Sequence, residues 1–279
     1  MIIDKNLINF TNQISIALKR LNLLNFFFKN TVLLLTRRTL LSSLWLFLKP
    51  AVPLLVYTIV FGTFINIKSE ISYPYLIFLL SGFVPWAIFD DCLYWTTRTY
   101  EANKKIIKKI NIPFLLLPIG SSLAGLLMSL TSLIFLIFAT IYYSVTDMLI
   151  LSINLKNILL ILVSIISSYF FALGLGYILC IFNARFRDTK FSVKIFLSGL
   201  LYITPVMYPL SKIPEKFTNF ILIFNPISIP VLNFRCSFVN SVCDASLAIT
   251  FLNLILSIFI LLIGIKFYLN SVKQGIIIK

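Results

Sequence analysis

Long apolar runs, separated by short polar or proline-containing segments, are the feature that most restricts how this chain folds. A helix needs roughly 20 apolar residues to cross the hydrocarbon core of a bilayer. The chain is 59% hydrophobic with a mean hydropathy of +1.00, whereas a soluble domain is about 45–50% apolar. We therefore predict an all-α integral membrane protein with six transmembrane helices, at about residues 39–64, 74–96, 113–143, 157–182, 193–209 and 248–268.

The basic residues divide unevenly between the segments that connect these spans. The chain carries 24 lysines and arginines against 9 acidic residues. If both termini are cytoplasmic, the outside segments hold only Lys68, Lys156, Lys212, Lys216 and Arg235. Cytoplasmic loops of membrane proteins retain positive charge, so we predict that both termini are inside. Because the cations lie between apolar spans, we expect membrane lipids, and no nucleic acid, as their partners.

Several kinds of catalytic or metal site are excluded by composition. The chain has no histidine, which rules out histidine-based zinc sites, catalytic triads and proton relays. Its four cysteines form no CxxC pair, so we predict no metal site. No GxxxxGK[ST] phosphate loop is present, and the chain therefore carries no P-loop ATPase of its own. We assign no catalytic residue and no bound cofactor.

Residues 1–38 are predicted to form a cytoplasmic and interfacial segment ahead of the transmembrane domain, 39–279. Within residues 11–30, one helical face carries apolar side chains, Ile14, Ala17, Leu18, Leu21 and Leu24. Such an amphipathic helix lies in the membrane interface. The alternative is a poorly ordered basic leader. Arg37 and Arg38 then mark the membrane edge.

Prolines break the chain between the fifth and sixth spans. Pro205 and Pro209 interrupt the end of one apolar run, and Asn225-Pro226 and Pro230 interrupt the next, Phe217 to Phe234. Proline removes a backbone donor and disfavours helix in the residue before it. We predict a pair of external re-entrant helices here. Broken backbone at membrane depth is tolerated only beside protein or a water-filled cavity, so this region is expected to shape a passage.

Two spans contain charged residues. Lys49 precedes Pro50 in the first span, and either faces protein or water in the passage or lies nearer the interface and snorkels. Asp90 and Asp91 lie near the end of the second span. They either pair with lysines beyond it, bind an ion, or are solvated at the interface, and the last or a structural pair is the preferred interpretation.

An ordered set of short motifs resembles one family over nearly the whole chain. The motifs are TLLSSLWLFLKPAVPLLVYTIVFG at 39–62, GFVPW at 82–86, NKKIIKKINIPFLLLP at 103–118, NARFRD at 183–188, TPVMYP at 204–209, and Asn225-Pro226 with Arg235 beyond it. In this order and spacing they resemble the membrane subunit of ABC-2-type polysaccharide exporters, which handle O-antigen, capsule and teichoic acid chains. Lys49 departs from the pattern, since the family often has a neutral residue there.

The resemblance implies a permease subunit of the bacterial inner membrane that exports a polysaccharide, expected to be lipid-linked. It implies a homodimer with two copies of a separate ATPase subunit, which binds the ATP and Mg²⁺. Spans one and five are expected to line the channel. Residues 98–112 look like the coupling helix that contacts the ATPase, with the alternative of a solvated positive loop; its charged residues are Arg98, Glu101, Lys104, Lys105, Lys108 and Lys109.

Candidate substrate contacts follow from the chemistry of such a glycan. Cations suit its phosphate, and aromatic faces suit its sugar rings. The candidates are Arg37, Arg38, Lys49, Arg185, Arg187, Trp86, Tyr202 and Tyr208. The alternatives are charge retention at the cytoplasmic face for the arginines and core packing or an interfacial belt for the aromatic residues.

Three further questions stay open from the sequence. A rival function within the same fold is an ABC-2 permease for a drug or an ordinary lipid. A rival of another class is a membrane-embedded glycan-processing enzyme, which needs carboxylates grouped at one membrane face; here Asp90-Asp91 is the only pair. Finally, Cys236 and Cys243 both fall outside on this topology and are candidates for a disulfide.

Overall fold

The computed structural model describes residues 19–36, 44–65, 74–107, 113–146, 154–239 and 247–274, without the side chains of residues 35, 36, 105, 106, 215 and 239. All regular elements in these ranges are helices. They are α2 (Asn22–Thr36), α3 (Leu44–Tyr57), the π-helical η2 (Thr58–Phe64), α4 (Tyr75–Thr97), α5 (Thr99–Ile107), α6 (Leu116–Val145), α7 (Leu155–Arg185), α8 (Thr189–Ile203), the 3₁₀ turn η3 (Leu210–Lys212), α9 (Glu215–Phe224), α10 (Ser228–Val239) and α11 (Leu247–Lys273).

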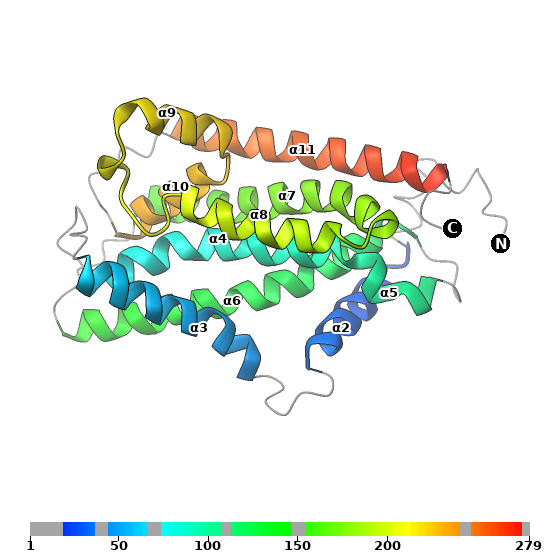
Figure 1. Ribbon diagram of the computed structural model, residues 1–279, viewed down its shortest axis with the longest axis horizontal. Helices are drawn as coiled ribbons and strands as arrows, with labels where there is room; N and C mark the ends of the chain where they lie inside the picture. The colour runs from blue at the N-terminus through cyan, green and yellow to red at the C-terminus, as the bar shows by residue number, and fades with distance from the viewer. Residues whose placement is uncertain are drawn as a thin grey trace.

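The long helices run side by side along one axis, with α2 and α5 at one end and α9 and α10 at the other (Figure 1). We call these the α5 end and the α9 end. Five helices within the described residues are long and apolar enough to cross a membrane: α3 with η2, α4, α6, α7 and α11. They match the first four and the sixth predicted spans. The prediction of an all-helical, multi-pass membrane protein is confirmed at this level.

The fifth predicted span differs from the helix found there. Instead of covering residues 193–209, α8 begins at Thr189 and ends at Ile203. Its 15 residues are about 22 Å long at 1.5 Å per residue, which is less than the roughly 30 Å of a bilayer core. Pro205 ends the helix because the residue before it is driven to extended backbone, and Thr204 has φ −73° and ψ 134°. A six-span count therefore stays a prediction.

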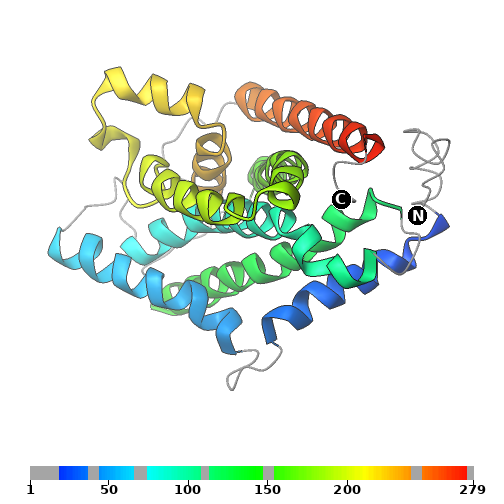
Figure 2. The same cartoon turned by 45° about the vertical axis from the view of Figure 1, so that its right-hand side comes forward.

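The predicted break at Asn225-Pro226 is confirmed. Residues Lys216–Phe224 and Ser228–Phe238 form two helical pieces bent by 104°, and the turn between α9 and α10 is visible in Figure 2. Cys236, in α10, is disulfide-bonded, and Cys243 lies outside the described residues. Cys92 and Cys180 are free and buried.

The central helix is α4, which is buried on all sides. In its candidate span 83% of the most apolar stretch is buried, against 11% for α3 with η2. A helix that is apolar all round belongs inside a bundle. Its side chains Val84, Trp86 and Phe89 form the core together with Leu136 of α6 and Val231 of α10.

Glycines permit the closest contacts between the long helices. A Cβ on Gly264 of α11 would lie 2.2 Å from the carbonyl oxygen of Gly174 in α7. A Cβ on Gly176 would lie 2.5 Å from the Thr96 side chain of α4. Small residues allow membrane helices to approach closely in this way. Pairing of α7 with α11 and α4 therefore depends on these positions.

We predict that Gly264→Ala destabilises the protein by about 1–3 kcal/mol, because the new methyl group must push two backbones apart. Gly199→Ala in α8 is the matched control, since a Cβ there meets nothing within 4 Å. Thermal unfolding of the purified chain in detergent, followed by size-exclusion chromatography, measures both. Equal midpoints for the two variants would contradict this packing.

Candidate functional site

The short helix α5 has one face against the bundle and one face exposed. Tyr100 and Asn103 are 7% and 0% exposed, whereas Glu101 and Lys104 face outward. Residues three and four apart share a helical face, so this division follows directly from the sequence order. An element at the end of a bundle with a fixed inner face and a charged outer face is suited to contact another protein.

Three buried tyrosines fix the inner face of α5. The Tyr100 hydroxyl donates to the Tyr268 hydroxyl of α11 at 2.7 Å, and Tyr268 donates to the Phe114 carbonyl at 3.0 Å. Tyr177 of α7 donates to the Leu115 carbonyl at 2.9 Å. Buried hydroxyls need such partners. The network joins α5 to α11, α7 and the start of α6.

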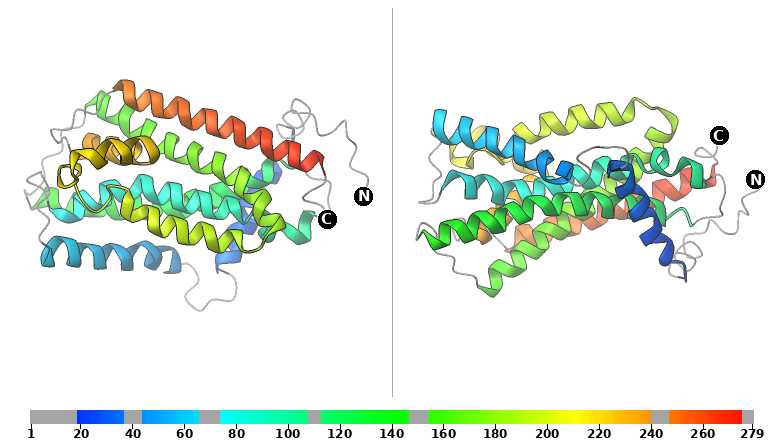
Figure 3. Two further views of the ribbon diagram at one scale, coloured as in Figure 1. Left: turned by 45° about the horizontal axis from the view of Figure 1, so that its top comes forward. Right: turned by 90° about the horizontal axis from the view of Figure 1, so that it is seen from below.

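The helix α2 packs against the same end, crossing the long helices at an angle (Figure 3). Asn30 donates to the Asn103 side-chain oxygen at 2.9 Å and to the Ala102 carbonyl at 3.3 Å. Phe27 is fully buried, and a Cβ on Gly120 would lie 2.5 Å from it. The face of α2 that packs against the bundle therefore carries Phe27 and Thr31. Leu21, predicted to share the apolar face, is exposed, because α6 and α5 cover a neighbouring face.

Glu101 links α5 to the beginning of α8. Its carboxylate lies 2.9 Å from Lys190 Nζ and 3.3 Å from Arg98 Nε. Arg98 also donates to the Tyr94 hydroxyl at 3.0 Å. Partial burial opposes ionisation, but the hydrogen bonds from Lys190 and Arg98 outweigh it and hold the pKa of the Glu101 carboxyl below its usual value.

Lys49 forms an ion pair with Asp91 across α3 and α4. The Lys49 side chain is 53% exposed and that of Asp91 is 8% exposed. Asp91 therefore pairs with a lysine of the first span, and not with lysines beyond the second. Pairing lowers the cost of a lysine in an apolar helix.

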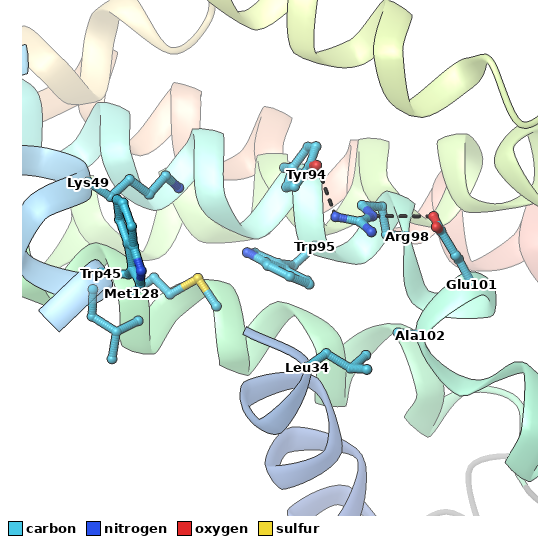
Figure 4. Close-up of a pocket in the computed structure, with 10 residues that line it drawn as sticks. Leu34, Trp45, Lys49, Tyr94, Trp95, Arg98, Glu101, Ala102 and Met128 are labelled. Atoms are coloured by element: carbon cyan, nitrogen blue, oxygen red, sulfur yellow. Dashed lines mark hydrogen bonds and ion pairs between the residues drawn. The ribbon is translucent and has the colours of Figure 1, made fainter. Parts of the chain in front are cut away.

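A crevice of about 580 Å³ adjoins this ion pair. Lys49 and Trp45 lie at one end of it, and Arg98 with Glu101 lies at the other (Figure 4). The remaining wall is made by Tyr94, Trp95, Leu34, Leu46, Ala102 and Met128. Ligand sites typically measure about 300–1,000 Å³, so the crevice is large enough for a small headgroup.

The other predicted contact residues are not gathered in one place. Trp86 is 3% exposed and packs in the core against Phe89. Tyr208 donates to the carbonyls of Tyr202 and Ile203, both at 2.9 Å, and so caps the end of α8. Arg185, the last residue of α7, and Arg187, just after that helix, are exposed at the α5 end. The Arg185 guanidinium lies 5.4 Å from the Phe186 ring centre. Arg37, Arg38, Lys108 and Lys109 lie outside the described residues.

Arg235 is a buried structural residue, whereas the sequence placed it in an outside segment and in the motif set without a role. It is 3% exposed in α10 and donates to the carbonyls of Pro205 and Val206 at 2.9 and 2.6 Å. Its guanidinium lies 3.8 Å from the Phe78 ring centre. Arg235 thus joins the end of α8 to α10 and α4. The available signal was a lone arginine within an apolar, proline-broken run.

We predict that Tyr100→Phe lowers stability by about 0.5–1.5 kcal/mol, because it removes the donor to Tyr268. The matched control is Tyr142→Phe, at a tyrosine of α6 that is 65% exposed. Chemical unfolding in a fixed detergent measures both variants. No difference between them would contradict a stabilising role for the tyrosine network.

We predict a pH-dependent contribution from Glu101. A carboxyl whose pKa is lowered on folding stabilises the protein above its unfolded pKa of about 4.3, and this stability is lost as pH falls through the folded value. Glu101→Gln should therefore be less stable than the unchanged chain at pH 7, by at most about 1 kcal/mol for so exposed a pair. Thermal unfolding from pH 7 to pH 3.5 should show the difference disappearing, and a constant difference would contradict it.

This chain is similar to several known proteins. No protein-family model matches the chain. The chain is 26% identical over 204 residues to the O-antigen export system permease protein RfbA of Klebsiella pneumoniae, covering 73% of this chain and 75% of that protein. It is 27% identical over 191 residues to the Myxococcus xanthus protein of that name, covering 68% and 70%.

A third relative carries a different glycan in its name. The chain is 27% identical over 192 residues to the polysialic acid transport protein KpsM of Escherichia coli, covering 67% of this chain and 69% of that protein. These relatives confirm the resemblance found in the sequence motifs. Over roughly two thirds to three quarters of its length, this helical membrane protein is similar to the permease subunits of polysaccharide export systems.

Proposed function

We propose that this chain is the permease subunit of an ABC transporter that exports a polysaccharide across the bacterial inner membrane. The similarity to named O-antigen and polysialic acid transport proteins carries this proposal. A lipid-linked glycan is the expected cargo. A separate ATPase subunit binds ATP and Mg²⁺, in keeping with the missing phosphate loop in this sequence.

The exposed face of α5 is the proposed contact with the ATPase. Lys104 and Glu101 face outward, while Tyr100 and Asn103 fix the helix to α11 and α2. A force applied to a helix held in this way is passed to the bundle instead of being absorbed by a loose loop. This proposal places the α5 end in the cytoplasm, which agrees with the positive charge there.

The ion pair between Glu101 and Lys190 carries the motion onward to α8. α8 begins beside α5 and ends where Arg235 holds the carbonyls of Pro205 and Val206. ATP-driven movement of α5 therefore reaches the α9 end through α8. The broken pair α9 and α10 is proposed to be the external re-entrant element.

A second copy of the chain completes the passage. The helix α3 leaves Val52, Leu55 and Val56 exposed, and α8 leaves Ile195 and Phe196 exposed. Exposed apolar faces on two helices that are expected to line the channel suit a homodimer interface. The proposed complex therefore has two permease and two ATPase subunits.

We predict that Lys104→Glu abolishes or strongly weakens co-purification of the ATPase in mild detergent, because it reverses charge on the proposed contact. Lys212→Glu, at an exposed lysine in η3 at the opposite end, is the matched control and should retain the ATPase. An ATPase retained by both variants would place the contact elsewhere. An intact chain that captures no ATPase, but processes glycan alone, would favour the membrane-enzyme alternative.

We predict that Lys190→Met lowers glycan export several-fold while leaving ATPase binding intact, because it removes the link from α5 to α8. Lys194→Met, at an exposed lysine one turn later in the same helix, is the control. Export per ATP hydrolysed, measured in cells or proteoliposomes, separates coupling from binding. Equal export by the two variants would show that Glu101 and Lys190 do not transmit the motion.

A further inference from the structure

The crevice beside α4 combines positive charge with aromatic surface inside the apolar part of the chain. Its two cations are Lys49 of α3 and Arg98 at the end of α4. Trp45 lies at the Lys49 end of the crevice, and Tyr94 and Trp95 lie along the wall between the two cations (Figure 4).

The spacing of these groups follows from helix geometry. Asp91, Trp95 and Arg98 lie on one stripe of α4, together with Tyr94, because positions i, i+3, i+4 and i+7 share a helical face. Seven residues of helix cover about 10 Å, which separates the partner of Lys49 from Arg98 along the helix axis. On the facing wall, Trp45 and Lys49 lie one turn apart in α3.

The cations are neutralised but still accessible. Asp91 is 8% exposed, whereas the side chain of Lys49 is 53% exposed and that of Arg98 is 27% exposed. A lysine ammonium has three donors, and its described hydrogen bond to Asp91 uses one of them. The ion pair therefore makes the lysine tolerable in an empty crevice while leaving donors for a second anion.

We propose that this crevice binds the phosphate–sugar junction of the lipid-linked glycan, with Lys49 shared between Asp91 and a phosphate of the ligand. This inference rests on the proposed function. Lys49 and Arg98 supply charge at the two ends for a diphosphate, and hydrogen bonds to charged groups are the stronger ones. Trp45, which is 52% exposed, supplies a face for the apolar side of a sugar ring.

Lys49 is the specificity-determining residue in this proposal. It stands before Pro50 in α3 and supplies the cation at that end of the crevice. A neutral glycolipid would leave the lysine unused. An ordinary phospholipid shares the phosphate but offers no sugar ring to Trp45.

The test measures ligand binding to the full-length chain in lipid nanodiscs. The probe is a fluorescent polyprenyl diphosphate carrying one N-acetylhexosamine, with the same sugar on an uncharged polyprenyl ether as the neutral comparison. The variant Lys49→Met with Asp91→Asn removes the cation without leaving an unpaired carboxylate. Lys49→Arg retains charge, and Lys266→Met removes an exposed lysine of α11 that lies outside the crevice.

We expect the double variant to bind the diphosphate probe about 10–100-fold more weakly, the range given by loss of a hydrogen bond to a charged group. Lys49→Arg and Lys266→Met should bind it nearly normally, and binding of the neutral probe should be weak and unchanged in all variants. Arg98→Gln leaves the ion pair between Lys49 and Asp91 in place. This variant should also bind the diphosphate probe more weakly.

Two results would overturn the proposal. Equal binding of the diphosphate probe by the double variant and the intact chain would show that Lys49 only pairs with Asp91. Displacement of the probe by phosphatidylglycerol at equal concentration would assign the crevice to phospholipid headgroups. If either result accompanies normal ATP-driven glycan export, this site fails and the proposed function stands; if the intact chain exports no glycan with its ATPase, both fail.

Discussion

Enclosure of α4 is the constraint on which the rest of the structure depends. Most of this helix is apolar and buried, and α6, α7 and α10 surround it. Gly125 of α6 and Gly176 of α7 permit that approach. A Cβ on Gly125 would lie 2.6 Å from the Asp91 carbonyl oxygen of α4, and a Cβ on Gly176 would lie 2.5 Å from the Thr96 side chain. Asp91 of α4 and Arg98 just after it lie beside α3 and α5. Lys49 and Glu101 meet them there.

Polar contacts at both ends tie α8 to helices distant in sequence. At the α5 end, Lys190 binds Glu101, and α5 is in turn fixed to α11 through Tyr100 and Tyr268. At the α9 end, Arg235 holds the backbone that follows α8. A short helix with both ends fixed passes displacement from one side of the bundle to the other. In the proposed exporter, this property would carry displacement from the ATPase contact at the α5 end to the α9 end.

Properties set by local sequence were predictable. Apolar length gave five spans, and Asn225-Pro226 gave the break between α9 and α10, because proline acts on its own neighbours. The early end of α8 was misjudged, although Pro205 was visible, because apolar residues continue past it. Hydropathy measures how well a segment is accommodated in lipid, whereas the backbone restriction before a proline decides where a helix ends.

Contacts between helices were not predictable from one sequence. The pairing of Lys49 with Asp91, the burial of Arg235 and the core position of Trp86 all depend on which helices become neighbours. Hydropathy assigns a residue to a span and not to a face of the bundle. The candidate site was accordingly predicted by residue type, while its grouping into α5, the crevice and the α8 contacts came from the fold.

Reconstitution tests the central claim most directly. The chain and its ATPase are placed in liposomes together, and transbilayer movement of a fluorescent lipid-linked glycan is followed with and without ATP. The proposed function predicts movement that requires both proteins and ATP hydrolysis. Movement or chemical conversion of the glycan by this chain alone, unaffected by the ATPase, would contradict it.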